Sequence, residues 1–278
     1  MPGLAPGIHV FRAIGAQVVD GRDKPGHDGC RIITLMTTRE RADRLLVARG
    51  LFESRARAQA AIAAGLVSAD GVVVRKASDA IATDAVIAAE PAHPYVSRGG
   101  VKLASALDTF GIDVRDHVCL DVGASTGGFT EVLLARGARK VYAVDVGTGQ
   151  LHVRLRGRDE VVALEQTDIR ALGPKRLPER PDFATVDVSF ISLKLVLPAI
   201  GNLLGPRARL LALIKPQFEA PRRAIKKGIV RDEAVHAAVC DGIAAFLASL
   251  GWRVGGQIAS AILGGDGNRE FFVEAARD

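Results

Sequence analysis

An alternation of strand-like and helix-like segments constrains the fold of residues 102–278 more than any other feature of the sequence. Short apolar runs bounded by turn residues alternate with longer stretches of helical periodicity, the pattern of βαβ units that build a parallel sheet. Strands are expected over residues 117–122, 140–146, 161–164, 183–188, 208–214, 252–260 and 270–275. Helices are expected over residues 101–109, 130–136, 193–203 and 232–250. We therefore predict an α/β domain with a seven-stranded sheet.

The first expected strand runs directly into a glycine-rich turn. Such a turn between a strand and a helix lets backbone amides approach a ligand at the positive end of the helix dipole. A dinucleotide or S-adenosylmethionine would fit it. The dinucleotide fingerprint GxGxxG is not met, because position 125 is serine and the glycines fall at 123, 127 and 128. The candidate cofactor-binding residues are Asp121, Gly123, Ala124, Ser125, Thr126, Gly127, Gly128 and Phe129.

Polar residues at the ends of the following strands extend this candidate site. Asp145 ends the second strand and can accept hydrogen bonds from both ribose hydroxyls of a nucleoside, in either cofactor class. Asp168, just past the third strand, is placed to accept from an adenine amino group. Asp187 and Lys215 end the fourth and fifth strands, at the carboxyl edge where open α/β sheets bind ligands. With the final hairpin-like pair of strands, these positions favour S-adenosylmethionine and a methyltransferase over a dehydrogenase.

Residues 36–89 have the pattern of a small α+β domain. A helix is expected over residues 38–48, and a second over residues 55–64 with Ser54 as its N-cap. Segments 66–69 and 72–74, joined by Asp70-Gly71, predict a β-hairpin with a type I′ turn, and a further strand is expected over 84–88. Six arginines against three acidic residues give residues 36–64 a charge of +3, which suits phosphate binding or a solvated helix face.

The overall composition leaves the partner open. The chain carries a net charge of +6 at pH 7 and a pI of about 9.5, which fits a polyanion partner or a merely soluble basic protein. No apolar stretch reaches the roughly 18 residues that span a bilayer, so we expect no membrane-spanning segment. Cys30, Cys119 and Cys240 form no CxxC pair, which argues against a zinc site or a disulfide framework and for reduced, cytoplasmic thiols.

Two segments outside the expected domains have a different composition. Residues 1–35 are rich in glycine and proline and lack the basic and apolar regions of a signal peptide. We expect them to be a disordered leader or the product of an over-long choice of start codon. Residues 90–95 contain two prolines and suit a short, stiff linker. This linker separates an expected domain over residues 36–89 from one over residues 96–278.

The N-terminal segment resembles a known RNA-binding module. The stretch "RADRLLVARGLFESRARAQAAIAAGLVSADGVVVRKASDAI" (41–81) is similar to the αL domain named after the fourth protein of the small ribosomal subunit. In that family two short helices and a hairpin hold structured RNA, with basic side chains of the helices at the phosphates. The resemblance implies that Arg44, Arg55 and Arg57 contact RNA here.

The rest of the chain looks like the FtsJ-type ribose 2′-O-methyltransferases. The resemblance is carried by "YVSRGGVKL" (95–103), "LDVGASTGGFTEVLL" (120–134), "VYAVDVGTGQL" (141–151), "DVSFISL" (187–193), "LIKPQFE" (213–219) and "GNREFF" (267–272). With the N-terminal module, the chain is similar to the hemolysin A family of rRNA methyltransferases. This similarity implies a Rossmann-like methyltransferase domain, S-adenosylmethionine as cofactor, and ribosomal RNA within a ribosomal subunit as partner.

FtsJ-type enzymes use a Lys-Asp-Lys-Glu tetrad, which the resemblance places at Lys102, Asp187, Lys215 and Glu270. A ribose hydroxyl is a poor nucleophile at neutral pH, and a lysine can take its proton when burial and a second cation lower the pKa of an amine. We expect Lys215 at the centre, Asp187 and Lys102 beside it, and Glu270 as an outer carboxylate that orients the lysines. No metal is expected, because methyl transfer develops no phosphate-like charge.

Each tetrad position also has an ordinary structural interpretation. Lys102 fits a snorkelling lysine on a helix, Asp187 a helix cap, and Glu270 a charge on an edge strand. Lys215 is harder to explain in this way, because a lysine flush against the apolar run 210–214 needs a partner.

A basic loop after the fifth strand contains Arg222 and Arg223, followed by Lys226 and Lys227. This loop either grips the RNA backbone or faces solvent. Three other function classes also stay open: a catalytically silent RNA-binding factor in ribosome assembly, a cytolysin as the family's name implies, and, more remotely, an NAD-dependent enzyme.

The resemblance also bears on the ribosomal subunit. Longer members of the hemolysin A family extend past the final strand with a helical tail and modify both subunit RNAs. Shorter members lack the tail, start close to the first helix of the RNA-binding module, and modify only the large-subunit RNA. Here only residues 273–278 follow the last motif, too few for a stable helix, and Met36 lies just before the first expected helix. We therefore expect a cytidine of the large-subunit RNA as target.

Overall fold

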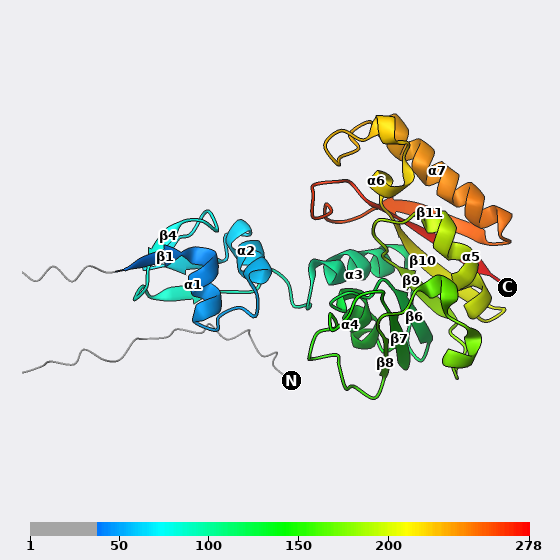
Figure 1. The fold of residues 1–278 in the computed structure, drawn as a ribbon, viewed down its shortest axis with the longest axis horizontal. Coiled ribbons are helices and arrows are strands. Elements are labelled where there is room, and N and C mark those ends of the chain that lie inside the picture. Colours follow the sequence, from blue (N-terminus) through cyan, green and yellow to red (C-terminus); the bar gives the residue numbers. More distant parts are fainter. Residues whose placement is uncertain (1–37) are drawn as a thin grey trace, which may run out of the picture. The chain divides into compact units, whose positions relative to one another are not determined.

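The computed structural model describes residues 38–278, which divide into two compact units between Pro94 and Tyr95 (Figure 1). The expected leader, residues 1–35, and Cys30 lie outside the described residues. Cys119 and Cys240 are buried free thiols. Within residues 38–278, none of the helices combines the length and the apolar character needed to cross a membrane.

Residues 38–94 form a small α+β domain with two helices and two short sheets. Its elements are β1 (Arg39–Arg41), α1 (Ala42–Ala48), α2 (Arg55–Ala63), β2 (Val67–Ala69), β3 (Val72–Val73), β4 (Ala80–Ala82) and β5 (Ile87–Ala89). One sheet has the strand order β3-β2-β5 and the other pairs β1 with β4, all antiparallel. Leu45 and Leu46 of α1, Ile62 of α2 and Val67 of β2 lie in one buried core.

Two predicted elements of this domain were displaced. The first helix begins at Ala42 and not at residue 38, because Arg39 to Arg41 pair with the distant strand β4. The last strand, β5, is shifted toward the C-terminus of its predicted range 84–88. The predicted hairpin is confirmed: Asp70 and Gly71 have φ values of 50° and 77°, as a type I′ turn requires.

Residues 95–278 form a seven-stranded sheet with helices on both faces. Its strands are β6 (Val118–Val122), β7 (Lys140–Val144), β8 (Val161–Leu164), β9 (Phe183–Val186), β10 (Ala208–Ile214), β11 (Arg253–Ala259) and β12 (Phe271–Arg277). Their order is β11-β12-β10-β9-β6-β7-β8. β12 runs antiparallel to β10 and β11, and the pairs among β10, β9, β6, β7 and β8 are parallel. The predicted seven-stranded, Rossmann-like fold is confirmed.

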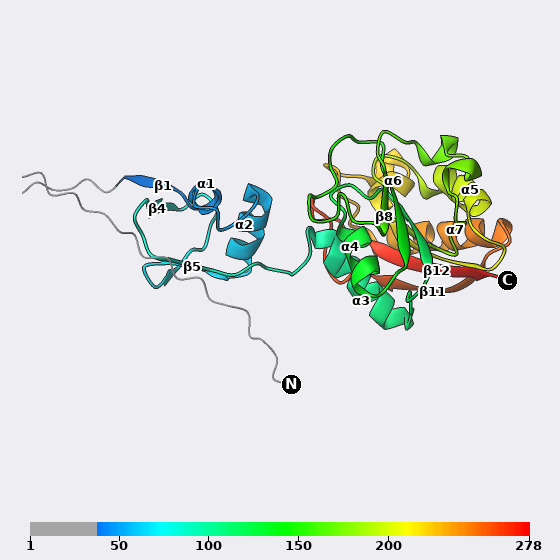
Figure 2. The same ribbon diagram turned by 90° about the horizontal axis from the view of Figure 1, so that it is seen from below.

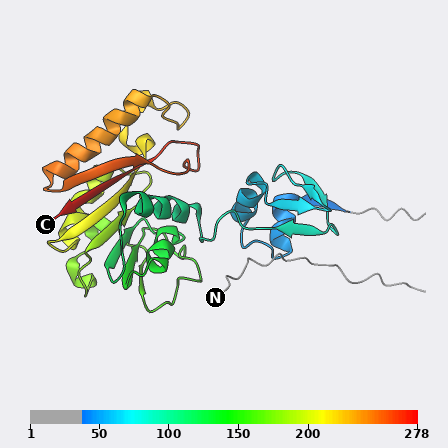
Figure 3. The same cartoon turned by 180° about the vertical axis from the view of Figure 1, so that it is seen from behind.

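The helices of this domain form one layer on each face of the sheet. They are α3 (Arg98–Phe110), α4 (Gly128–Ala135), α5 (Leu193–Leu203), α6 (Pro216–Glu219) and α7 (Glu233–Ser249). Helices α3 and α4 pack on one face, and α5 and α7 pack on the other (Figures 2 and 3). α3 begins at Arg98, earlier than predicted, and a Cβ at Gly100 would lie 2.4 Å from the Tyr95 ring. Gly100 thus lets the residues before the helix pack closely against its first turn.

Strand β6 marks the point where the strand order reverses. It pairs with β7 on one side and with β9 on the other, so the chain moves outward in both directions from its carboxyl end. Open α/β sheets bind ligands at such a position. The glycine-rich turn follows β6 directly, so it lies at this ligand-binding edge of the sheet.

Candidate functional site

The glycine-rich turn needs glycine at two positions for steric reasons. Gly123 has φ +83°, and a Cβ there would lie 2.3 Å from the carbonyl oxygen of Asp187. Gly127 has φ +93°, and a Cβ there would lie 2.3 Å from Cδ1 of Leu155. The turn therefore packs against the end of β9 on one side and under a neighbouring loop on the other, in a backbone conformation that other residues rarely adopt.

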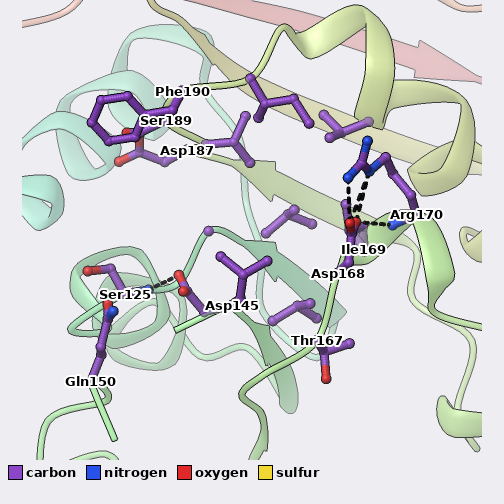
Figure 4. A pocket seen from close by; sticks show the side chains of 17 residues that line it. Ser125, Asp145, Gln150, Thr167, Asp168, Ile169, Arg170, Asp187, Ser189 and Phe190 are labelled. Atoms are coloured by element: carbon purple, nitrogen blue, oxygen red, sulfur yellow. Dashed lines mark hydrogen bonds and ion pairs between the residues drawn. The ribbon is translucent and has the colours of Figure 1, made fainter. Parts of the chain in front are cut away.

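Asp145 follows β7, and backbone amides hold its carboxylate. Its Oδ2 accepts from the Ser125 amide at 2.8 Å (Figure 4), and its Oδ1 accepts from the Gly147 amide at 2.7 Å. These bonds fix the side chain beside the glycine turn, at the wall of a cavity.

This cavity has a volume of about 470 Å³ and lies at the carboxyl edge of β6, β7 and β9. Its lining residues include Val122, Gly123, Ser125, Val144, Asp145, Gln150, Asp168, Ile169, Asp187 and Val196. Apolar side chains alternate with a few carboxylates, as in pockets that hold a small molecule of nucleoside size. The predicted residues Gly123, Ser125, Asp145, Asp168 and Asp187 thus line one space that fits the nucleoside part of S-adenosylmethionine.

Asp168 lies in this wall, but its carboxylate already has partners. It caps the 3₁₀ helix η1 (Ile169–Ala171) by accepting from the Arg170 amide at 2.9 Å. It also forms an ion pair with the Arg170 guanidinium at 2.6 Å (Figure 4), which lowers the pKa of the Asp168 carboxyl. The expected adenine acceptor is therefore a charged carboxylate that shares its oxygens with Arg170.

Asp121, a candidate cofactor-binding residue, does not line this cavity. Its side chain is fully buried and accepts from the hydroxyls of Thr130 at 2.6 Å and Thr185 at 3.0 Å. Burial raises the pKa of Asp121 to about 6. The structure thus places Asp121 beneath the glycine turn, where it joins β6, α4 and β9. The motif alone does not reveal this depth.

A second cavity, of about 250 Å³, adjoins the first and shares Gly123, Ser125 and Asp187 with it. Its other lining residues are Ser97, Arg98, Gly99, Lys102, Ala124, Thr126, Gly128 and Phe129. The predicted residues of the turn are therefore divided: Ala124, Thr126, Gly128 and Phe129 face this smaller space. Gly127 lies beneath Leu155.

The four tetrad residues form two ion pairs. Lys102 on α3 contacts Glu270, just before β12, with 2.5 Å between Nζ and Oε2, and both side chains are buried. Lys215 at the end of β10 contacts Asp187 after β9, with 2.6 Å between Nζ and Oδ1. Lys215 Nζ also donates to the Ser189 hydroxyl at 2.8 Å. We expected Glu270 at the outside of one cluster, whereas it is the direct partner of Lys102.

This geometry bears on the ordinary interpretations of these residues. Lys102 does not snorkel, because its ammonium is buried against a carboxylate. Glu270 is not an edge-strand charge, because it precedes β12, which lies between β11 and β10. Lys102 and Asp187 line the smaller cavity together, so the two ion pairs meet at one space.

Phe190 is a residue of this edge that the sequence analysis did not single out. Its side chain is 90% exposed and its φ is +64°, which is uncommon for a bulky residue. It lines the larger cavity beside Asp187 (Figure 4), and its ring lies 5.1 Å from that of Phe218. The sequence feature that could have pointed to Phe190 is its place as a large aromatic residue in the loop just after the carboxyl end of a strand.

The N-terminal domain presents arginines that are anchored on a buried carboxylate. Asp43 of α1 is buried and contacts Arg41 at 3.1 Å and Arg55 at 2.6 Å. The Arg41 guanidinium, which donates to Asp43, holds the pKa of that carboxyl well below its usual range. Arg44 is exposed on α1, and Arg57 is partly buried on α2. Arg41, which shares this carboxylate with Arg55, was not among the predicted RNA contacts.

The second predicted basic segment lies in the C-terminal domain. Arg222 and Arg223 are exposed in the 3₁₀ helix η3 (Arg222–Ala224), shortly after β10. Within residues 38–278, His, Cys, Asp and Glu side chains form no group of three or more that could hold a metal ion.

The chain matches two protein-family models and is similar to several known proteins. Residues 95–277 match the model described as FtsJ-like methyltransferase, and residues 40–87 match the S4 domain. The 16S/23S rRNA (cytidine-2'-O)-methyltransferase TlyA of Mycobacterium tuberculosis is 43% identical, over 86% of this chain and 90% of that protein. The 23S rRNA (cytidine-2'-O)-methyltransferase TlyA of Campylobacter jejuni is 38% identical, over 64% of this chain and 69% of that protein.

A solved structure of a hemolysin-type protein from Streptococcus thermophilus supports the same relationship. It superimposes with a TM-score of 0.70 at 43% identity and covers 87% of this chain and 89% of its own. The chain therefore belongs to the hemolysin A (TlyA) family of S-adenosylmethionine-dependent rRNA methyltransferases, in which an FtsJ-like methyltransferase domain follows an S4 domain.

Proposed function

We propose that this chain transfers the methyl group of S-adenosylmethionine to the ribose 2′-hydroxyl of a cytidine in ribosomal RNA. Two lysine–carboxylate contacts carry the proposal, Lys102–Glu270 and Lys215–Asp187. They lie at the smaller cavity, which adjoins the larger cavity of about 470 Å³. Asp187 lines both cavities. A methyl donor in one space and a ribose hydroxyl in the other would therefore meet beside this carboxylate.

On the donor side, the residues of the chain bind and orient. Asp145, fixed by two backbone amides, accepts from the ribose hydroxyls. The glycine positions of the turn let its backbone approach the ligand closely, and Asp168 bounds the adenine end with Arg170. When bound, S-adenosylmethionine supplies the electrophilic methyl group. Asp121 lies beneath the turn and supports it by accepting hydrogen bonds from the Thr130 and Thr185 hydroxyls.

On the acceptor side, Lys215 is the proposed proton acceptor. Its Nζ is oriented by Asp187 and by the Ser189 hydroxyl. After the Lys215 ammonium has released a proton to solvent, its neutral Nζ takes the proton of the 2′-hydroxyl, and Asp187 stabilises the ammonium that forms again. Lys102, held by Glu270, lines the same cavity as Asp187 and bounds the space proposed for the acceptor ribose.

RNA binding is divided between two proposed surfaces. In the N-terminal domain, proposed over residues 36–89, Arg44, Arg55 and Arg57 contact phosphates. In the methyltransferase domain, proposed over residues 96–278, Arg222 and Arg223 grip the RNA backbone. Residues 90–95 link the domains. The exposure of Arg44, Arg222 and Arg223 supports these roles, because a phosphate contact needs an accessible guanidinium.

We further propose the large-subunit RNA as the target. The printed name of the M. tuberculosis relative includes both 16S and 23S rRNA, and that of the C. jejuni relative includes 23S rRNA alone. The 23S rRNA is therefore the substrate that both names share. A ribosomal target places the proposed activity in the cytoplasm.

The test offers purified small and large subunits separately, from cells that lack the protein, with methyl-labelled S-adenosylmethionine. We expect label on a cytidine 2′-oxygen of the large-subunit RNA, and loss of the label with Lys215→Ala. Label confined to the small subunit would overturn the choice of subunit. No label in either subunit would overturn the methyltransferase proposal.

A further inference from the structure

Asn268 is a buried polar residue in the segment between β11 and β12. Only 1% of this residue's surface is exposed. Its carbonyl oxygen accepts from the Gly264 amide at 2.9 Å, and the Gly267 amide donates to the Gly264 carbonyl at 3.0 Å. Gly267 has φ +84°. These contacts make residues 264–268 a tight turn with the Asn268 side chain pointing away from its own segment, toward residues 228–230.

The Asn268 amide grips the base of a basic hairpin. Its Nδ2 donates to the Gly228 carbonyl at 2.9 Å, and its Oδ1 accepts from the Val230 amide at 3.1 Å. Lys226 and Ile229 exchange both backbone hydrogen bonds, at 2.9 and 3.0 Å. The residues between them, Lys227 and Gly228, both have positive φ, at 52° and 79°. The hairpin thus presents two exposed lysines on a tight turn.

The same turn also shapes the surroundings of Glu270. Glu270 lies two residues after Asn268, and its carbonyl accepts from the Ser260 amide at 2.8 Å. A Cβ at Gly264 would lie 2.5 Å from Glu270 Oε1, so the turn packs directly on this carboxylate. The other carboxylate oxygen, Oε2, receives the Lys102 ammonium. Asn268 is therefore joined to the Lys102–Glu270 pair through its backbone and to the basic hairpin through its side chain.

We propose that Asn268 is a positioning residue that fixes the basic hairpin, residues 226–229, relative to the Lys102–Glu270 pair. RNA phosphates that contact Lys226 and Lys227 are then held in register with the acceptor cavity. The proposal rests on the proposed methyltransferase function. It differs from a purely structural role, because the effect of Asn268 on RNA binding must pass through the two lysines.

The test is a double-mutant cycle measured on the full chain with large subunits. Lys226→Ala with Lys227→Ala should raise the KM for RNA about 10-fold at moderate salt, through the loss of up to two phosphate contacts, and leave kcat near that of the wild type. Asn268→Ala should raise KM by a similar factor and also lower kcat about 10-fold, because Glu270 is displaced. In the triple variant, KM should rise no further, since the hairpin lysines are already absent.

One control variant and one alternative Asn268 variant complete the test. Gln257→Ala removes another amide-to-backbone bond, from Nε2 to the Cys240 carbonyl at 2.8 Å, on the neighbouring strand β11 and away from the hairpin, and should change neither constant. Asn268→Asp keeps the acceptor for the Val230 amide and serves if Asn268→Ala does not fold. It should show the same pattern at smaller size.

Multiplicative effects on KM in the triple variant would overturn the inference, as would an unchanged kcat in both Asn268 variants. The inference fails alone in these cases, because the wild-type chain still methylates RNA. An inactive wild-type chain would instead sink the proposed function on which the inference rests.

Discussion

The two domains each bury one aspartate beneath a proposed ligand surface, and they hold it in opposite ways. In the N-terminal domain, Asp43 receives the guanidinium groups of Arg41 and Arg55, and the hydrogen bond from Arg41 holds the pKa of its carboxyl well below the usual range. In the methyltransferase domain, Asp121 receives two threonine hydroxyls, and burial raises the pKa of its carboxyl to about 6.

The difference matches the ligands that the two surfaces are proposed to bind. A charged anchor beneath the N-terminal surface orients guanidinium groups, whose remaining N–H donors can reach phosphates. The glycine-rich turn depends on close packing more than on charge, because Gly123 and Gly127 lie against Asp187 and Leu155 with no room for a side chain. RNA binding should therefore depend on salt and on cations, whereas cofactor binding should depend on a few fixed hydrogen bonds.

The largest effect is expected at Lys215. Lys215→Ala should lower kcat by about 10²- to 10⁴-fold, the range that general acid–base groups contribute. The dissociation constants for RNA and S-adenosylmethionine should change little, because the role of Lys215 lies in the transition state. Single-turnover methylation and direct binding assays separate these quantities.

Lys140→Ala is a matched control for this experiment. Lys140 also contacts a carboxylate, Glu179, but it lies at the start of β7, far from the carboxyl edge of the sheet. Its removal should leave kcat unchanged. Full activity in Lys215→Ala would show that the tetrad assignment is wrong.

A smaller effect is expected from the arginines of the N-terminal domain. Changing Arg44, Arg55 and Arg57 together to Ala should raise the RNA dissociation constant about 10- to 100-fold and flatten its salt dependence by up to about three phosphate contacts. The rate at saturating RNA should stay close to that of the wild type. Filter binding over a salt series measures both the constant and the slope. An unchanged slope would show that these arginines do not contact RNA.

Much of the methyltransferase fold could be predicted from the sequence, because its elements are local patterns. The ranges 161–164, 193–203 and 208–214 were predicted with the bounds that the structure shows, since each is an apolar or amphipathic run with clear ends. β1 was missed because its pairing with β4 joins residues far apart in the chain. β4 was missed as well. It is three residues long and buries one side chain, that of Ile81, so its sequence carries too little periodicity to predict a strand.

The candidate site was predicted as a set of residues but not as a set of contacts. Motif order placed Lys102 and Glu270 in one tetrad, but their direct pairing across 168 positions depends on the sheet order. The depth of Asp121 likewise depends on Thr185 from β9, which the glycine motif does not include. Arg41 was not singled out, and the structure shows that it ends β1 with its guanidinium on Asp43.

The next effect concerns the cofactor. Asp145→Ala should weaken S-adenosylmethionine binding by about 1–3 kcal/mol, the range for losing a hydrogen bond to a charged group. RNA affinity and its salt slope should not change, which is the reverse of the arginine variant. Titration calorimetry measures both ligands on the same protein. Equal affinity for S-adenosylmethionine in wild type and variant would show that Asp145 does not contact the ribose.

The smallest effect is a pH dependence of stability with opposite sign in the two domains. The pKa of Asp121 is raised on folding, so its protonated form stabilises the native state below about pH 4, and this contribution is lost as pH rises through about 6. Asp121→Asn should therefore gain stability relative to wild type between pH 4 and 7. The single tryptophan of the chain, Trp252, is buried in this domain, so its fluorescence reports the unfolding.

Asp43 should behave in the reverse way. The pKa of its carboxyl is lowered on folding, so its contribution is present above about pH 4 and is lost as pH falls below that value. Asp43→Asn should lose stability relative to wild type as pH rises from about 3 to 6, which hydrogen exchange in the N-terminal domain can follow. The same slope for both variants would contradict the contrast between the two anchors.

The most direct test of the central proposal is to map 2′-O-methyl groups at nucleotide resolution on ribosomal RNA from cells with and without this protein. We predict a methylated cytidine in the large-subunit RNA that disappears without the protein, returns with the wild-type chain, and does not return with Lys215→Ala. Identical maps with and without the protein would contradict the account.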